Sequence, residues 1–486
     1  MMKNRKQEKY IYALVGVICI IIVGKCVFQW KEKKDSSLQT LNKLKDKVDI
    51  ENQKAMKGKE TEILIDEMEE DKETVKIRVL ITNAKDDSYY HDHIVLQSNG
   101  KMVNLTTNQE FKENQKVSVS ELPDVTCIFS SEERISLVSN EKNGRIPFYE
   151  GNLEIYKDEK GYYVINEIDI ETYLKYVVPS EMPAGYPQEA LKAQAVCART
   201  YALKQIEEGR LKDFPAHVDD TVSYQVYNQI DPQETTNRAV DETAHKVMQH
   251  DGELIQAYFF STSCGFTSTE KVWSGREKEN YLQSISVSKQ TVEALANGNL
   301  GKLPELSQQK DFSVYIRNVH ELDYENEESW YRWKIKFPWE EIGRRVSENQ
   351  WQIGELQEII IKERTSGGAV YLLQFVGTQG EMELSNEYKI REFFSPKGYT
   401  MQMNGNIEQK GGSLLPSAYI DLEIAVDDGE KYVQIYGGGY GHGVGMSQNG
   451  AKEMAKDGLL WEEILKVFYK NVDIISIYSL AYEKKW

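Results

Sequence analysis

The chain has 486 residues, enough for two or three domains, and 40% of them are hydrophobic, as in ordinary globular proteins. The formal net charge is −18 at pH 7, and no basic stripe occurs beyond the N-terminus. This charge pattern argues against a nucleic-acid partner, which needs a basic surface. The 29 tyrosines outnumber the 14 phenylalanines, and tyrosine rings suit polar, ring-shaped ligands as well as an ordinary core.

The first 30 residues are typical of a membrane segment. Basic residues precede an unbroken apolar run at 10–24, and Trp30 marks the far interface beyond Lys25. Positive residues before a span place the N-terminus in the cytoplasm and the main domain on the outer face of the cell membrane. No small-x-small site follows the run, so an uncleaved single-pass anchor is favoured over a signal peptide. Lys25 argues against lipoprotein cleavage at Cys26.

Composition and periodicity divide the rest of the chain. Residues 31–73 are charged and lack aromatic side chains, as in a membrane-proximal stalk, and from Thr74 apolar residues alternate with polar ones at the period of a strand. The predicted parts are a basic cytoplasmic tail at 1–9, a transmembrane anchor at 10–30, a stalk at 31–73, a β-rich region at 74–167 and a core at 168–475 with an insertion at 286–329.

Two helices are expected where the period changes after the β-rich region. Asp169 is a good N-cap for the first helix, which should stop at Val178 because Pro179 disfavours helical geometry before it. The second helix should start near Pro187 and end at Gly209. Its many alanines indicate close packing against a neighbouring element.

Strand-like runs dominate again beyond the second helix. One of them is a hairpin that turns at Asp428 and Gly429, and helices are expected at 448–456 and 461–469. The order of elements predicts an α+β fold: a mixed, strand-rich exterior domain with a few helices, behind the single N-terminal membrane anchor.

Three of the five cysteines, Cys127, Cys197 and Cys264, lie beyond the predicted anchor. They are widely spaced and form no C-x-x-C motif, so no metal framework is indicated. Small buried residues are the default interpretation, and a bridge between Cys197 and Cys264 stays open.

The stretch "VVPSEMPAGYP" places Glu181 between Pro179 and Pro183. Two prolines restrict the backbone on both sides, and a catalytic acid needs such positioning. An ordinary surface glutamate is the alternative.

A second motif, "GGGYGHGVGMSQNGA", starts at Gly437, and six of its first nine residues are glycine. Glycines let a backbone approach a ligand closely, so this stretch is a candidate wall of a binding groove in which His442 is a hydrogen-bond partner for substrate or for Glu181. The alternative is a tight structural turn around a core histidine. The stretch matches neither the P-loop nor the dinucleotide pattern, which argues against phosphate binding.

A third motif, "FFSTSCGFTS", offers three small hydroxyls at 261–263 after an apolar strand. It lacks a G-x-S-x-G elbow, so groove-lining donors are favoured over a serine nucleophile. A catalytic Cys264 with His442 as base rests on two residue types alone. Arg199, on the second helix, is a candidate for orienting Glu181 or binding a substrate carboxylate, and a structural role is equally open.

Together and in this order, the three motifs resemble the family of stage II sporulation protein D (SpoIID) and the LytB amidase enhancers. The resemblance covers roughly 74–468. It implies a peptidoglycan lytic transglycosylase that cleaves the MurNAc–GlcNAc bond and leaves 1,6-anhydroMurNAc ends, in cell-wall remodelling during sporulation and engulfment. Glu181 matches the family's catalytic acid/base. The implied partners are glycan strands stripped of stem peptides and a cell-wall amidase, with no cofactor and no nucleic acid.

The motifs and the resemblance also indicate substrate-binding residues: Arg199, Tyr201, Gln225, Tyr227, Ser261, Thr262, Ser263, Tyr440, His442, Gly443, Met446 and Gln448. Some family members hold zinc with cysteine and histidine. Asp219, Ser223 and Tyr224 stand at the corresponding places here, with His217 nearby, so no metal is expected.

Two other functions compete with the enzyme. A non-catalytic glycan-binding enhancer of an N-acetylmuramoyl-L-alanine amidase could keep the same glutamate. A structural surface protein would leave the shared motifs unexplained.

Overall fold

The computed structural model describes residues 74–479 except 122–125, 143, 210, 228–229 and 299–304. The chain divides into two units, Met1–Glu73 and Thr74–Trp486, and all described residues belong to the second. The predicted cytoplasmic tail, anchor and stalk therefore lie outside the described residues. Among the residues described from 74 onward, none of the helices has the length and apolar character needed to cross a membrane.

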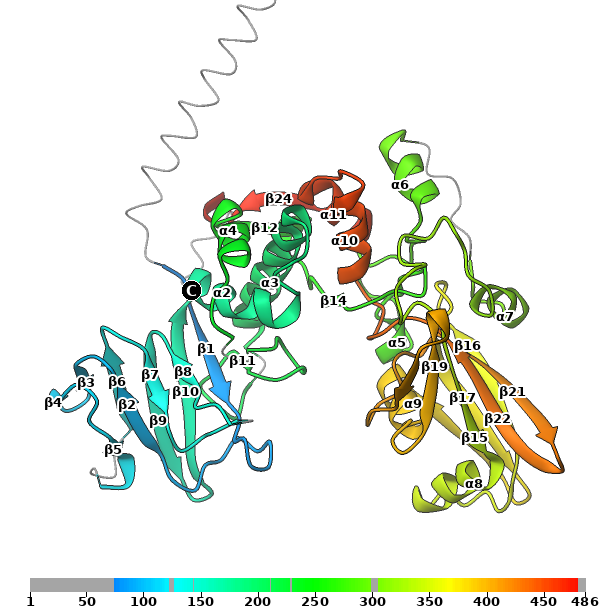
Figure 1. The fold of residues 1–486 in the computed structure, drawn as a ribbon, viewed down its shortest axis with the longest axis horizontal. Coiled ribbons are helices and arrows are strands. Elements are labelled where there is room, and N and C mark those ends of the chain that lie inside the picture. The colour runs from blue at the N-terminus through cyan, green and yellow to red at the C-terminus, as the bar shows by residue number, and fades with distance from the viewer. Residues whose placement is uncertain are drawn as a thin grey trace, which may run out of the picture. The chain divides into compact units, whose positions relative to one another are not determined.

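Two sheets form the N-terminal part, where the sequence alternates with a period of two (Figure 1). The larger has the strand order β11-β1-β10-β9-β6-β3-β4 and the smaller the order β5-β2-β7-β8. Their elements are β1 (Lys76–Ile81), β2 (Val95–Ser98), β3 (Met102–Asn104), β4 (Gln109–Phe111), β5 (Val117–Ser118), η1 (Val119–Glu121), β6 (Cys127–Ser131), β7 (Ile135–Leu137), β8 (Phe148–Tyr149), β9 (Asn152–Asp158), β10 (Gly161–Asp169) and β11 (Val218–Asp219). Because β11 pairs in parallel with β1, the larger sheet includes a strand from beyond residue 167.

Helices and short strands follow. The helices are α2 (Ile170–Glu181), α3 (Gln188–Glu208), α4 (Glu234–Glu242), α10 (Gln448–Lys456) and α11 (Trp461–Phe468). The short strands are β12 (Lys246–His250), β13 (Glu253–Leu254), β14 (Phe259–Phe260), β23 (Met446–Ser447) and β24 (Asp473–Ser476), with η3 (Ile477–Ser479) after them. Helix α3 packs against the other four helices, and its alanine-rich faces are buried, as predicted (Figure 1). The parallel pair β14–β23 joins the serine motif to the glycine-histidine motif.

The remaining strands form sheets of order β20-β19-β15-β22-β21 and β16-β17-β18 around a second apolar core. The strands are β15 (Trp333–Pro338), β16 (Leu356–Arg364), β17 (Val370–Gly377), β18 (Glu381–Ser385), β19 (Thr400–Met403), β20 (Glu408–Lys410), β21 (Ile420–Asp427) and β22 (Glu430–Gly437). The helices are α5 (Lys271–Ser274), α6 (Lys289–Ala296), α7 (Gln309–Ile316), α8 (Trp339–Glu348), α9 (Glu387–Phe393) and η2 (Asn404–Asn406). The α+β fold class is confirmed for the described residues, whereas the anchor is not.

Local sequence signals predicted several element ends correctly. The Asp169 carboxylate caps α2 by accepting from the backbone N–H of Thr172 at 3.1 Å, and Gly209 ends α3 in the left-handed conformation at φ 56°. The predicted hairpin joins β21 to β22, with Asp428 at φ 48° and Gly429 at φ 85°, the conformation of a type I′ turn.

The predicted end of the first helix is wrong. Helix α2 continues through Pro179 to Glu181. Proline lacks an N–H, but the last turn keeps two other bonds: Met182 N–H donates to the Val178 carbonyl at 2.9 Å, and the Ser180 hydroxyl donates to the Tyr176 carbonyl at 2.7 Å. Glu181 is therefore the last residue of a helix rather than part of a loop.

The segment 286–329, predicted as an insertion or long loop, contains α6 and α7. Phe312 and Ile316 of α7 are buried in the larger apolar core. Eight-residue helices carry too few apolar side chains for their period to be recognised.

The three described cysteines are buried thiols. Cys197 Sγ lies 3.4 Å from the Tyr469 hydroxyl and 3.9 Å from Met446 Sδ, while Cys264 Sγ lies 4.0 Å from the Phe266 carbonyl. Cys197 and Cys264 are therefore separate thiols and form no disulfide bridge with each other. The default interpretation, that these cysteines are small buried residues, is confirmed.

Candidate active site

A cavity of about 330 Å³ brings residues from all three sequence motifs together. Its walls come from the end of α2, from α3, from the 222–226 loop, from the β14 and α5 segments, and from the glycine-histidine stretch. The lining residues are Glu181, Tyr201, Val222, Ser223, Tyr224, Val226, Tyr258, Phe259, Phe260, Ser261, Trp273, Tyr440, Gly441, His442 and Gln448. Six predicted site residues are therefore gathered in one cavity: Glu181, Tyr201, Ser261, Tyr440, His442 and Gln448.

Glu181 is held at this cavity by α2 and by one backbone hydrogen bond. Its Oε1 accepts from the backbone N–H of Val226 at 2.7 Å. Burial raises the pKa of Glu181 to about 7, and the Val226 hydrogen bond offsets part of that rise. Because Oε1 accepts a hydrogen bond, the proton of the neutral acid belongs on Oε2, which has no hydrogen-bond partner within the described part of the chain.

The other lining side chains are aromatic, aliphatic or neutral polar. Among the described residues that line the cavity, Glu181 alone carries a carboxyl group. The Tyr258 ring packs against Trp273 at 5.0 Å and against Tyr201 at 6.0 Å between centroids. Such a cavity suits a neutral, ring-shaped ligand and offers one proton donor.

The 222–226 loop supplies wall residues that the sequence interpretation missed. Gln225 and Tyr227 face the interior instead of the cavity: Gln225 donates to the Ala198 carbonyl at 3.1 Å, and the Tyr227 hydroxyl donates to Asn166 at 2.8 Å. Their neighbours Tyr224 and Val226 line the cavity. Residues 224–227 alternate between the cavity and the interior, so the motif was located, but the residues assigned to the cavity were wrong by one position.

The glycine stretch owes its composition mainly to packing. A Cβ on Gly445, at φ 78°, would lie 1.9 Å from the Tyr258 carbonyl oxygen, and a Cβ on Gly443 would meet the Tyr419 ring at 2.5 Å. Gly441, at φ 115°, lines the cavity and leaves no room for a Cβ beside Phe260. The predicted thin wall exists at Tyr440–His442, and the surrounding glycines contact protein instead of ligand.

His442 lines the cavity, but its ring is engaged by the protein. Nδ1 accepts from the backbone N–H of Val444 at 3.1 Å, and the ring is also hydrogen-bonded to the Phe259 backbone. Burial, with the nearby Arg391 charge, lowers the pKa of His442 to about 3. A neutral, doubly bonded imidazole fits the alternative of a core histidine that shapes the turn, with its ring 5.2 Å from Trp273.

Three predicted groove residues lie in the interior beside the cavity. Thr262 accepts from Asn449 at 2.9 Å, Ser263 binds the carboxylate of Glu325, and Met446 is fully buried. Glu325 was not singled out in the sequence. Its carboxylate accepts from Ser263 N–H at 2.8 Å and from the Ser447 hydroxyl at 2.6 Å, so it joins the segment that follows β14 to the start of α10. Burial raises the pKa of Glu325 to about 7.

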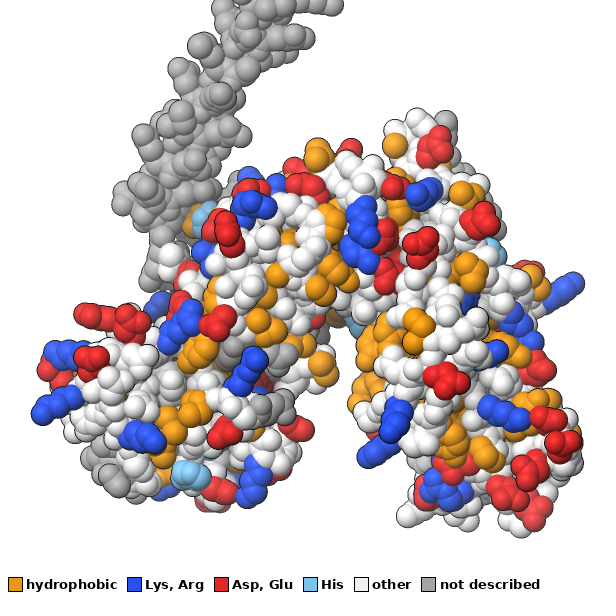
Figure 2. Space-filling model, viewed as in Figure 1, with side chains coloured by type: hydrophobic (Ala, Val, Ile, Leu, Met, Phe, Trp, Pro, Cys, Tyr) orange, Lys and Arg blue, Asp and Glu red, His pale blue; other side chains and the backbone are white. Residues whose placement is uncertain are grey.

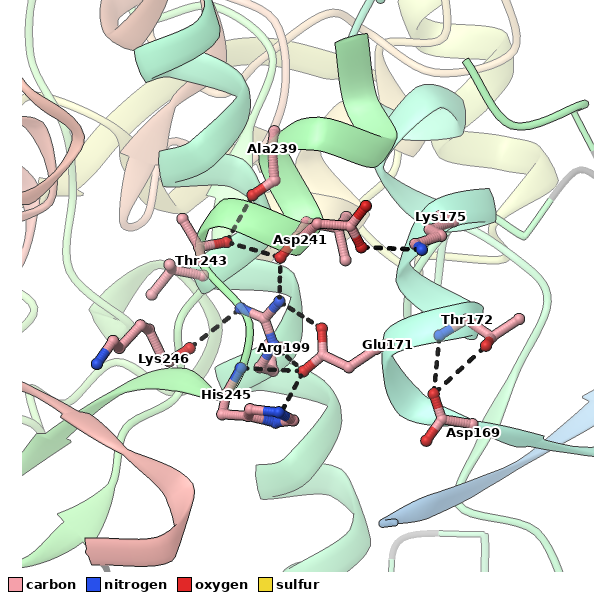
Figure 3. A network of polar contacts seen from close by, with 12 residues as sticks. Asp169, Glu171, Thr172, Lys175, Arg199, Ala239, Asp241, Thr243, His245 and Lys246 are labelled. Atoms are coloured by element: carbon pink, nitrogen blue, oxygen red, sulfur yellow. Dashed lines mark hydrogen bonds and ion pairs between the residues drawn. The ribbon is translucent and has the colours of Figure 1, made fainter. Parts of the chain in front are cut away.

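Arg199 is placed away from the cavity in a polar network (Figure 3). Its guanidinium is fully buried and pairs with both carboxylate oxygens of Glu171, at 2.8 and 2.6 Å. It also donates to the carbonyls of Val240 and Lys246, each at 3.2 Å, and Glu171 accepts from the backbone N–H of His245. Of the two roles that the sequence left open, this geometry fits the structural one, because these contacts join α2, α3, α4 and β12.

The residues at the zinc positions of some relatives are bonded within the protein. Asp219 accepts from the Tyr89 hydroxyl at 2.8 Å and from Thr221, while His217 Nδ1 accepts from the Arg78 N–H at 3.1 Å. Across the described residues, no three His, Cys, Asp or Glu side chains form a group that could hold a metal ion. The expectation of a metal-free domain stays a prediction.

Charges are mixed on the surface around these elements. On the face shown in Figure 2, acidic and basic side chains are interspersed, with hydrophobic ones between them. No single sign of charge dominates that face, so it offers no strong field to steer a charged ligand.

Comparisons with known proteins show which proteins this chain is similar to. A family model described as Stage II sporulation protein (SpoIID) matches residues 158–250, and a Domain of unknown function (DUF8618) matches residues 267–445. The chain is 30% identical over 320 residues to the amidase enhancer of Bacillus subtilis (strain 168), a match that covers 62% of this chain and 40% of that protein. It is 31% identical to an uncharacterized protein of Brachyspira hyodysenteriae, a match that covers 64% of this chain and 68% of that protein. It is 26% identical to stage II sporulation protein D of Bacillus subtilis (strain 168), a match that covers 64% of this chain and 75% of that protein.

The fold and the cavity thus define a mixed α+β protein whose three sequence motifs meet at one buried acid. The chain belongs to the family of stage II sporulation protein D and the amidase enhancers. It spans less than half of the length of the Bacillus subtilis amidase enhancer that it matches.

Proposed function

We propose that this protein is a lytic transglycosylase that cleaves the MurNAc–GlcNAc bond of peptidoglycan glycan strands. The observation that carries the proposal is Glu181, the sole carboxyl group among the described lining residues, with its pKa raised to about 7 by burial. Hydrolytic glycosidases of the usual kind need a second carboxylate to activate water or to attack. One acid suffices when the sugar's own hydroxyl is the nucleophile.

The proposed reaction cycles one proton through Glu181. The neutral acid donates its Oε2 proton to the glycosidic oxygen as the bond from C1 of MurNAc breaks. The C6 hydroxyl of the same sugar then attacks C1, and its proton passes to the Glu181 carboxylate. The products are a free 4-hydroxyl on GlcNAc and a 1,6-anhydro ring on MurNAc, with no water consumed and the acid regenerated. A pKa near the working pH serves both halves of this cycle.

The cellular setting is part of the same proposal. We infer an anchored protein whose main domain faces the cell wall, acting during sporulation or engulfment on glycan strands already stripped of stem peptides. A cell-wall amidase that removes those peptides is the partner we propose.

The described domain, incubated with purified peptide-free glycan strands, is expected to release fragments with 1,6-anhydro ends. Mass spectrometry separates these from hydrolytic products because anhydro fragments lack the mass of one water. Reducing ends in place of anhydro ends would mean that water is the nucleophile and would contradict the single-acid mechanism.

The rate of cleavage is expected to fall as pH rises through about 7, the pKa to which burial raises Glu181. Only the protonated form can donate to the glycosidic oxygen, so the alkaline limb of the profile should report this group. Initial rates between pH 4 and 9 test the expectation, and a limb near pH 4.5, the ordinary value for glutamate, would contradict it.

A non-catalytic enhancer of an amidase is the second candidate, and one relative's name favours it: the 30% identical protein of Bacillus subtilis is an amidase enhancer. Intact glycan binding and stimulation of a purified cell-wall amidase, without anhydro ends from wild type, would favour this role.

A further inference from the structure

Tyr440 is an unusually exposed aromatic residue at the mouth of the cavity. Its side chain lines the cavity and is 43% exposed. The ring packs against Trp330, with 4.6 Å between centroids and 55° between planes. Trp330 is half-buried and comes from outside the three motifs, so it extends the aromatic surface beyond the cavity.

The backbone holds this aromatic pair in place without a ligand. Gly439 N–H donates to the Trp330 carbonyl at 2.7 Å, which joins the two segments directly. Tyr440 and Thr262 exchange two backbone hydrogen bonds, at 2.8 and 3.1 Å. A surface fixed in this way loses little freedom on binding, which favours affinity.

The surroundings of the pair indicate what it binds. Val222 lies on the 222–226 loop, which also lines the cavity, and its side chain is 87% exposed. Apolar side chains are therefore exposed on more than one wall of the cavity. Ser261 and Gln448 supply neutral polar groups to the same cavity that Tyr440 lines. A sugar ring matches this pattern, since its C–H face stacks on an aromatic ring while its hydroxyls meet polar neighbours.

We propose that Trp330 and Tyr440 form an outer sugar subsite, a platform on which one ring of the glycan strand stacks beside the bond that Glu181 cleaves. The inference rests on the proposed function for the identity of the ligand. Its consequence is a preference for longer strands, because a short fragment can occupy the Glu181 cavity without reaching Trp330.

Binding in a Glu181→Gln background tests the platform, since an uncleaved strand persists during the measurement. By calorimetry, Trp330→Ala and Tyr440→Ala are each expected to weaken the binding of long peptide-free glycan about tenfold, as the loss of a stacked ring would. The disaccharide should bind Trp330→Ala as it binds the background protein, whereas Tyr440→Ala removes a side chain that lines the cavity and should weaken the binding of both ligands. Trp339→Ala is the matched control, because Trp339 is also half-buried against the same apolar core but its ring lies under the Lys431 ammonium instead of against Tyr440, and it should change neither affinity.

Thermal melting shows whether each variant is folded, and if Trp330→Ala is not, the less drastic Trp330→Leu takes its place. Unchanged binding of long glycan by the folded variants would overturn the platform while wild-type cleavage still supports the enzyme. A length preference lost in these variants, with no cleavage by wild type, would keep the platform and overturn the transglycosylase. No binding of any glycan would overturn both.

Discussion

Glu181→Gln is expected to lower the rate of glycan cleavage by about 100-fold to 10,000-fold, the range that general acid–base catalysis contributes. Glutamine keeps the size of the side chain and can still accept from the Val226 N–H through its amide oxygen. It cannot donate and recover a proton, so only the chemistry is removed. Release of anhydro fragments per unit time, for both proteins at pH 6, measures the effect. Full cleavage by a folded variant would falsify the mechanism.

The stability of the same variant supplies an independent control. The folded-state pKa of Glu181 lies at about 7, above the ordinary 4.5, so the folded protein binds this proton more tightly than the unfolded chain. The group's stabilising contribution is complete below about pH 4.5 and is lost as pH rises through about 7. At pH 8 the glutamine variant, which has no charge to bury, should therefore melt no lower than wild type. A lower melting temperature there would mean that the carboxylate itself is stabilised by contacts other than that with Val226.

The ends of several helices and the turn of one hairpin could be predicted from the sequence because the signals that set them act over only a few residues. Asp169 and Gly209 end their helices through caps, and Asp428–Gly429 turns its hairpin through backbone conformation. None of these depends on distant contacts. Pro179 misled because its local preference was overridden by hydrogen bonds that the rest of the last turn still forms.

The residues of the candidate site could be predicted only where the sequence around them is unusual. Glu181, Tyr440 and His442 were found because their flanking prolines and glycines are unusual. Glu325 was missed because a single glutamate in a polar segment carries no signal, and its role comes from Ser263 and Ser447, far away in the chain. The motif containing Gln225 was found, but which side of it faces the cavity depends on how the loop packs.

Arg199→Ala is expected to lower the free energy of unfolding by about 3–5 kcal/mol, the cost of removing one partner of a buried ion pair. The change strands the Glu171 carboxylate and leaves the carbonyls of Val240 and Lys246 without a donor. Urea denaturation followed by circular dichroism measures it. Arg238→Ala is the matched control, since Arg238 is exposed and lies 3.9 Å from Glu242, and it should cost less than about 1 kcal/mol.

The result also decides between the two roles that the sequence left open for Arg199. If Arg199 is structural, its replacement should lower the stability of the protein. The variant that remains folded at low temperature should still bind glycan with wild-type affinity, because the guanidinium is fully buried and does not line the cavity. Glu171→Gln should weaken the same network from the other side, with a smaller loss because a neutral amide still accepts from the guanidinium. If Arg199→Ala instead keeps wild-type stability and loses glycan binding, the arginine contacts substrate in a conformation that differs from this one, and its assignment as a binding residue would be restored.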